Sequence, residues 1–306
     1  MSAAPAEALE RRDVHPAPLV DGRRAPSGAA GRLRRQFQRI LVSTREREEA
    51  DLERRIRAQP AVTRPNTIAL ISPKGGVGKT TSTFLAGNLL AGHLKLRAIA
   101  VDANPDFGTL ARLAPDGRRS ERSLADLLGD ADRIKTAAEL TPYVSRLPTG
   151  LHVLGAPRDA ELTASLGPER YGELVAFLGT FYEVVLLDLG TGVAGPLAHF
   201  AIERADQVVL VTTPEWVTST VVLDALSYVQ HDHTTVAINK SQLGSAVVNA
   251  IEDRFRAEHL HRAVTIPFDR QLATMLDCGT YTLEALGRRT RLAVKRLGLA
   301  VADQLV

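Results

Sequence analysis

The stretch that most constrains the fold is Ile71–Thr81, ISPKGGVGKTT, which lies between a short apolar run and a longer helical pattern. A glycine-rich turn from a strand into a helix directs several backbone N–H groups, and the positive end of the helix dipole, at one anion. The ordinary phosphate-binding pattern is G-x-x-x-x-G-K-[ST], and Gly78, Lys79 and Thr80 match its second half. A proline replaces its first glycine, and Lys74 adds a second lysine. The sequence therefore predicts a phosphate-binding loop with an extra lysine.

From residue 66 onward, short apolar runs alternate with helical patterns, which predicts βαβ units. Apolar residues make up 44% of the chain, enough to bury a sizeable core. We therefore expect an α/β fold with a mostly parallel, twisted sheet flanked by helices on both faces. The expected strands are 67–72, 96–102, 151–155, 183–189, 207–213, 235–239 and 263–267, and a last helix is expected over about 283–305.

The first 65 residues differ in composition from the rest. Residues 1–30 are rich in Ala, Pro, Gly and Arg without an apolar period, and we expect a disordered tail there. Over 31–65 apolar residues recur at helical spacing among arginines, which predicts a basic amphipathic helical extension to the main domain over 66–306. Residues 1–65 hold 14 arginines and nine acidic residues, whereas the whole chain has a formal charge of +3. The basic character therefore belongs to this segment.

Cysteine usage and hydropathy limit the class of protein. Because Cys278 is the one cysteine in the sequence, an intramolecular disulfide is impossible and a cysteine metal cluster is not expected. The sequence has no run of about 18 apolar residues, and its N-terminus lacks the apolar core of a signal peptide. We expect a cytoplasmic protein.

Two predicted strands end in carboxylates that can serve a bound phosphate. The second strand leads into VDANPDFGTL, where Asp102 can organise Mg²⁺ or an attacking water. The stretch YEVVLLDLGTG places Asp188 at the end of a buried strand, where it can hold Mg²⁺ through a water. Asn104 follows Asp102 by two residues, and the alternative interpretation makes it a turn residue before a proline. An ordinary strand-end cap is the alternative for Asp188.

Two later stretches fit recognition of a nucleotide base. VAINK ends a predicted strand with Asn239, whose amide offers a donor and an acceptor to an adenine edge. IPFDRQL supplies Pro267 and Phe268 to flank the ring, and Asp269 is expected to cap the next helix. Each stretch is equally consistent with an ordinary turn at a strand end.

Lys74–Thr81, KGGVGKTT, resembles the deviant Walker A motif of the ParA/MinD family of cytosolic P-loop ATPases, which position or regulate other cargo. The resemblance covers about 66–306, and VDANPDFGTL and FYEVVLLDLGTG look especially like actinobacterial members, some of which are linked to type VII secretion. It implies that Lys74 reaches the nucleotide of a second subunit, Lys79 holds the β- and γ-phosphates, and Thr80 ligates Mg²⁺. The implied ATP-binding loop consists of Gly75, Gly76, Val77, Gly78, Lys79, Thr80 and Thr81.

One departure from the family pattern bears on catalysis. Relatives usually read D-x-D-P after the second strand, whereas this chain has Asp102 followed by Asn104. The family uses its second Asp to orient the hydrolytic water, and an amide can hydrogen-bond that water but cannot accept its proton. The catalytic candidates are thus Lys74, Asp102 and Asn104, and the Mg²⁺ candidates are Thr80, Asp102 and Asp188. We expect slow hydrolysis of ATP.

Three functions remain open from the sequence. The first is an ATP-driven dimerisation switch, in which ATP and Mg²⁺ close two subunits face to face and the homodimer presents a surface to a partner or cargo. The second is a nucleotide-binding scaffold or regulator with negligible hydrolysis, which Asn104 favours. The third is a ligase of the dethiobiotin-synthetase type, and it ranks last because that group usually lacks the extra lysine.

The sequence also leaves open what the protein binds besides a nucleotide. The Arg-rich N-terminal segment or the last helix could contact DNA or an anionic membrane nonspecifically, and such a contact would hold the protein at the nucleoid or the inner face of the membrane. The alternatives for the N-terminal segment are docking on a protein partner or covering the edge of the main domain. The favoured alternative for the last helix is a closing helix with one solvated face. Its basic residues are Arg288, Arg289, Arg291, Lys295 and Arg296.

Overall fold

The computed structural model describes residues 46–59, 61–104, 108–226, 229, 233–242, 246–260 and 262–306. The main unit runs from Glu49 to Val306. The tail predicted over 1–30 and the first part of the extension predicted over 31–65 lie outside the described residues. The segment 46–57 is helical and falls within the predicted extension.

The sheet has eight strands in the order β3-β4-β2-β5-β1-β6-β7-β8 within the described part of the chain. Every neighbouring pair is parallel except β3–β4. The seven predicted strands are all present, and the sequence missed only the two-residue β3. The strands are β1 (Asn66–Ser72), β2 (Ala98–Ala103), β3 (Ser145–Arg146), β4 (His152–Leu154), β5 (Val184–Thr191), β6 (Gln207–Thr212), β7 (Thr234–Ser241) and β8 (Ala263–Pro267).

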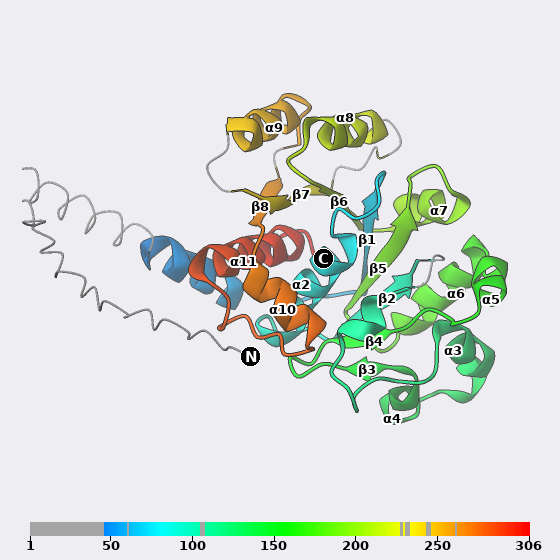
Figure 1. The fold of residues 1–306 in the computed structure, drawn as a ribbon. Helices are drawn as coiled ribbons and strands as arrows, with labels where there is room; N and C mark the ends of the chain where they lie inside the picture. The colour runs from blue at the N-terminus through cyan, green and yellow to red at the C-terminus, as the bar shows by residue number, and fades with distance from the viewer. Residues whose placement is uncertain are drawn as a thin grey trace, which may run out of the picture. The chain divides into compact units, whose positions relative to one another are not determined.

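Helices cover both faces of this sheet, as predicted (Figure 1). The last helix is shorter than predicted because Gly287 begins it. The α-helices are α2 (Lys79–Gly92), α3 (Leu124–Asp130), α4 (Ala137–Leu140), α5 (Ala160–Ser165), α6 (Pro168–Leu178), α7 (Pro196–Arg204), α8 (Trp216–Ala225), α9 (Ala246–Ala257), α10 (Arg270–Asp277) and α11 (Arg288–Ala302). Short 3₁₀ turns lie at Leu110–Leu113, Ala131–Arg133 and Thr141–Tyr143.

The central strands are apolar on both sides because each face of the sheet carries its own core. In β1, Ile68 and Leu70 belong to the core under α2, α10 and α11, whereas Ala69 and Ile71 belong to the core under α3, α6, α7, α8 and α9. This alternation follows from the two-residue period of a strand. The two cores fix the central strands, whose carboxyl ends carry the residues considered below.

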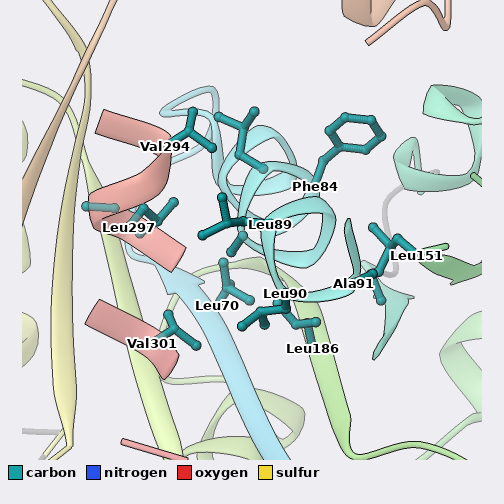
Figure 2. Packing of buried hydrophobic residues seen from close by; sticks show 14 of the residues in the cluster. Leu70, Phe84, Leu89, Leu90, Ala91, Leu151, Leu186, Val294, Leu297 and Val301 are labelled. Carbon is teal, nitrogen blue, oxygen red and sulfur yellow. The ribbon is translucent and has the colours of Figure 1, made fainter. Parts of the chain in front are cut away.

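The first of these cores is built around α2 and α11. Figure 2 shows Leu89 of α2 and Leu297 of α11 side by side, with Leu70 of β1 beneath them. Gly298 lets the two helices approach, because a Cβ there would lie 1.8 Å from Leu89 Cδ2. The last helix is therefore a closing helix packed on the domain, which was the favoured interpretation of its sequence.

The segment 49–57 packs on the outer side of α11. Leu52 and Ile56 form a small apolar cluster with Leu292 and Leu299. In the stretches that the structure describes, no helix combines the length and the hydropathy needed to cross a bilayer.

Candidate functional site

The glycine-rich loop connects β1 to α2, as the sequence predicts. Gly76 and Gly78 have φ values of 74° and 93°, which only glycine adopts without strain. Gly78 is the N-cap of α2, but no side chain caps this end, and the first turn has no acidic residue. The N–H groups at the start of α2 therefore face an anion site that the protein does not fill itself.

Neighbouring strands hold the loop in this shape. The Gly192 N–H donates to the Ser72 carbonyl at 2.9 Å, and the Asn239 amide donates to the Val77 carbonyl at 3.0 Å. A Cβ on Gly78 would lie 1.9 Å from Asn239 Nδ2. Both the backbone conformation and the space therefore require glycine at position 78.

The parallel order of the central strands brings the predicted lysine and carboxylates together. Lys79 Nζ lies 3.4 Å from Asp188 Oδ1, and the two side chains are only 8% and 1% exposed. Asp102 on β2 is in register with Asp188 on the adjacent β5. Because β1, β2 and β5 are neighbours and parallel, these residues meet at one edge of the sheet.

Burial sets the electrostatics of the two carboxylates. Burial, and then the charge of Asp188, raise the pKa of Asp102 to about 7, although the Leu110 N–H donates to its Oδ2 at 2.9 Å. Burial also raises the pKa of Asp188, and Lys79 opposes this shift. Asp188 Oδ2 is buried and has no hydrogen-bond partner among the described residues. A cation near this oxygen would satisfy it.

These residues fit Mg²⁺. The described residues contain no group of three or more His, Cys, Asp or Glu side chains that could hold a metal ion by themselves. Mg²⁺ usually binds one or two protein ligands and completes its shell with water and phosphate oxygens. Thr80 at the start of α2, together with Asp102 and Asp188, offers that kind of partial set next to the anion site.

Asn104 lies where the sequence places it, directly after β2. Its backbone N–H donates to Asp102 Oδ1 at 3.4 Å, and its side chain is partly buried. Its role toward a water stays a prediction.

Lys74 makes contacts that the sequence did not suggest. Its Nζ lies 3.1 Å from Thr218 Oγ1 and 3.2 Å from Glu215 Oε2, at the start of α8. Hydrogen bonds from Thr218 and Lys74 lower the pKa of Glu215. Lys74 thus rests on its own chain, and its reach to a second subunit stays a prediction. A contact over 141 residues leaves no local signal in the sequence.

The residues predicted for base recognition lie at the end of β7 and β8. Asn239 uses its amide on the loop, and its Oδ1 accepts the Lys240 N–H at 2.8 Å. Phe268 is 58% exposed next to Pro267. Asp269 caps α10, as predicted, because its Oδ1 accepts the N–H groups of the first turn at 2.9 and 3.2 Å. Contact with a base stays a prediction.

Lys240 is a loop contact that sequence reasoning missed. Its Nζ donates to the Gly76 carbonyl at 2.6 Å, and its φ of 56° turns the chain at the end of β7. The only signal was a lysine directly after Asn239.

The basic residues of α11 are largely occupied. Arg291 Nε and Arg288 Nε lie 2.9 and 3.2 Å from the Glu49 carboxylate, and Lys295 Nζ lies 2.9 Å from Glu53 Oε1. Arg289 and Arg296 are exposed. Three of the five residues predicted to contact DNA or lipid therefore already have acidic partners, which the sequence did not reveal because they lie more than 200 residues away.

Comparison with known proteins agrees with this geometry. Residues 68–296 match the family model described as the CobQ/CobB/MinD/ParA nucleotide binding domain. The ESX-1 secretion-associated protein EspI of Mycobacterium tuberculosis is 28% identical over 273 residues, which cover 86% of this chain and 40% of EspI. The septum site-determining protein MinD of Synechocystis is 30% identical over 148 residues, which cover 48% of this chain and 53% of MinD. The chain thus spans about half or less of these relatives.

Solved structures share the fold. A ParA family ATPase from Chlorobium tepidum superposes with a TM-score of 0.63 at 21% identity, covering 75% of this chain and 97% of that one. MinD of Pyrococcus horikoshii in complex with Mg-ADP gives a TM-score of 0.58 at 22% identity, covering 76% of this chain and 94% of that one.

Proposed function

This chain belongs to the CobQ/CobB/MinD/ParA nucleotide-binding family, and from that premise we propose that it is an ATP-dependent dimerisation switch that regulates a protein partner or cargo. The observation that carries the proposal is the uncapped start of α2, with the buried Lys79 beside Asp188, whose second oxygen is unpaired within the described structure. A triphosphate with Mg²⁺ supplies the charges that this site lacks.

Each side chain has a part in holding the nucleotide. The N–H groups of the loop and Lys79 bind the phosphates, and Thr80 and Asp188 orient Mg²⁺, which neutralises phosphate charge when bound. Asp102, which lies beside Asp188 on the adjacent strand, organises Mg²⁺ or the attacking water. Asn239, Pro267 and Phe268 contact the adenine base of the nucleotide. For this contact the Asn239 amide exchanges its hydrogen bond to the Val77 carbonyl for one to the base.

Lys74 is the residue that links ATP binding to dimer formation in this proposal. A lysine five residues before Lys79 is redundant for one nucleotide, and its Nζ now contacts the exposed Glu215 and the buried Thr218 at the start of α8. We assign it to the nucleotide of the second subunit, as in the family that its motif resembles. Closing of the two subunits then depends on bound ATP.

The relative EspI supports an assignment of the partner. EspI is named as an ESX-1 secretion-associated protein, and the match spans 86% of this chain. We therefore assign the partner to a secretion apparatus, with the switch on its cytoplasmic side, where ATP is present. DNA partitioning and division-site placement are the alternatives that the ParA and MinD neighbours supply.

The test is the oligomeric state by sedimentation velocity with ATP, with ADP and without nucleotide. We expect a dimer with ATP and Mg²⁺ alone. Lys79→Ala removes nucleotide binding, whereas Lys74→Ala retains it and loses the dimer. Lys135→Ala, an exposed lysine outside the loop, serves as the control and keeps both. Equal dimer content in all three nucleotide states would refute the switch.

A second candidate is a nucleotide-binding regulator with negligible hydrolysis. Asn104 favours it because an amide does not accept a proton from water. The rate of ATP turnover separates the two candidates, since a dimer that binds ATP and does not turn it over is such a regulator.

A further inference from the structure

A second cavity lies at the carboxyl ends of β2 and β4, beside the nucleotide site. Its walls come from 108–112 after β2, from 119–123 before α3 and from 155–158 after β4, and its volume is about 470 Å³. Figure 1 shows β4 and α3 at the same end of the sheet. In doubly wound sheets, crevices at the carboxyl ends of strands are the usual place for ligands. The volume is that of a small-molecule site.

Arginines dominate the lining of this cavity. The lining holds one carboxylate, that of Glu121, which pairs with Arg158, and four arginines: Arg112, Arg119, Arg122 and Arg158. Just outside the lining, Asp116 and Asp130 lie 3.0 and 3.5 Å from the guanidinium groups of Arg119 and Arg122. The Arg112 side chain makes no hydrogen bond or ion pair with any residue that the structure describes. With these three carboxylates counted, the cluster keeps one excess positive charge.

Two of these guanidinium groups are fixed in place. Arg119 donates to the carbonyls of Ala114 and Arg112, both at 2.7 Å. The Arg122 guanidinium stacks over the Tyr143 ring at 4.6 Å. A pre-positioned guanidinium loses little freedom when it binds an anion, which favours binding.

Other polar groups of the cavity wall form hydrogen bonds within the protein. The Ser120 hydroxyl donates to the Pro142 carbonyl at 2.7 Å, and the Ser123 hydroxyl is bonded to Asp126. The Leu124 N–H donates to the Gly155 carbonyl at 2.9 Å, which ties α3 to the end of β4. The walls are therefore built independently of any occupant, and Arg112 is the lining arginine without a partner among the described residues.

We propose that this cavity is a binding site for a small molecule that carries two or more phosphate groups. The pairs of Arg119 with Asp116 and of Arg158 with Glu121 are surface pairs, whose carboxylates are 93% and 78% exposed, and such pairs contribute little. A doubly phosphorylated molecule can therefore replace these carboxylates and also pair with Arg112, because guanidinium groups match phosphate oxygens in pairs. The arginines line one open cavity, whereas a nucleic acid would need a stripe of such residues along the surface. The site goes beyond the proposed switch and is separate from the phosphate loop.

The arginine-lined cavity and the nucleotide site share the segment 108–110. Gly108 forms part of the wall, and a Cβ on it would lie 2.3 Å from Asp102 Oδ2. The Leu110 N–H holds the same carboxylate. The loop that lines the cavity is thus the loop that positions Asp102.

The test is calorimetric titration of the full chain with pyrophosphate in the presence of EDTA. Lys79→Ala is introduced first, so that the phosphate loop does not contribute. In this background we expect one equivalent of pyrophosphate to bind. Adding Arg112→Ala with Arg158→Ala, both exposed residues, weakens binding by about tenfold or more, because two charge-assisted contacts are lost.

The control is Arg170→Ala with Arg256→Ala in the same background, two exposed arginines on α6 and α9. It leaves the affinity unchanged, and the melting temperatures of all variants show that they fold. Unchanged affinity in the Arg112 and Arg158 variant, or no binding of pyrophosphate at all, overturns the site. Tighter binding of citrate or hexaglutamate than of pyrophosphate overturns the phosphorylated ligand. Because Lys79 is absent throughout, neither result depends on the proposed switch.

Discussion

The two oxygens of the Asp188 carboxylate lie in different environments. One of its oxygens lies 3.4 Å from Lys79 Nζ, and the other is buried without a partner among the described groups. Leaving a buried polar atom unpaired costs about 1–3 kcal/mol. Such a cost at a strand end beside an anion site is the mark of a position kept for a ligand rather than for stability.

Asn104 is the residue from which we expect slow hydrolysis of ATP. We predict that Asn104→Asp raises the rate of ATP hydrolysis by about tenfold or more, because a carboxylate can accept the proton that the amide cannot, and general base catalysis contributes about 10²–10⁴-fold. Single-turnover hydrolysis of labelled ATP measures the change. ATP affinity, determined separately, is the control and stays within about threefold. An unchanged rate would show that Asn104 does not face the attacking water.

How much of the site the sequence reveals depends on the range of the contact. The loop glycines, Lys79, Asp102 and Asp188 were predicted because each stands at a strand end with a local motif, and parallel strands bring such ends together. Lys240 and the Glu215 contact of Lys74 were not, because a lysine side chain takes its partner from distant parts of the chain. A local sequence pattern therefore does not predict the partner of such a lysine.

At the scale of elements, the contact between α2 and α11 depends on a missing side chain. A Cβ on Gly298 would lie 1.8 Å from Leu89 Cδ2 and 3.0 Å from its Cβ. Leu89 is buried in the core, so it cannot move into solvent. The two helices must then separate or repack.

We predict that Gly298→Ala destabilises the protein by about 1–3 kcal/mol through overpacking. The matched control is Gly129→Ala in α3, where a Cβ would meet nothing within 4 Å among the described atoms. Alanine is the better helix former, so this variant is expected to gain up to about 1 kcal/mol. Urea unfolding of both variants measures the free energies. A gain for Gly298→Ala would contradict the packing described for α2 and α11.

The elements themselves were largely predictable, and the exceptions have physical causes. All seven predicted strands exist because buried parallel strands read as continuous apolar runs. The strand β3 was missed because two residues, Ser145 and Arg146, carry no periodicity. The last helix was predicted too long because Gly287, its N-cap, had been included in the helix.

At the scale of the whole molecule, two glutamates of the helical segment 49–57 neutralise part of the basic face of α11. Glu49 and Glu53 lie near the charged groups of Arg291 and Lys295, and Arg57, His93 and Glu284 line the same cavity. Hydrogen bonds from Arg291 and Lys295 lower the pKa values of Glu49 and Glu53, respectively. The basic character of the last helix is therefore smaller than its sequence indicates.

This pairing predicts a pH dependence of stability. Because the pKa values of Glu49 and Glu53 are lower in the folded chain, the pairing stabilises it fully above the usual glutamate pKa and is lost as the pH falls below it. We expect Glu49→Gln with Glu53→Gln to cost about 1–2 kcal/mol at pH 7 and much less near pH 3.5. Urea unfolding of the wild type and the variant across this range measures the difference.

The control for this prediction is Glu173→Gln, which removes an exposed pair with Arg170 on α6. Exposed pairs of this kind contribute about 0–1 kcal/mol, so a small effect is expected at every pH. A difference between wild type and the double variant that stays constant from pH 7 to pH 3.5 would mean that the pairing is not what the substitution removes.

The resting place of Lys74 has a consequence for its release. Its partner Glu215 is 64% exposed and its own side chain is 52% exposed, so solvent weakens this ion pair. Its second partner is the hydroxyl of the buried Thr218, which itself donates to Glu215 at 2.8 Å. Movement of Lys74 away from α8 therefore breaks one screened ion pair and one hydrogen bond, and it leaves the Thr218 hydroxyl with a partner.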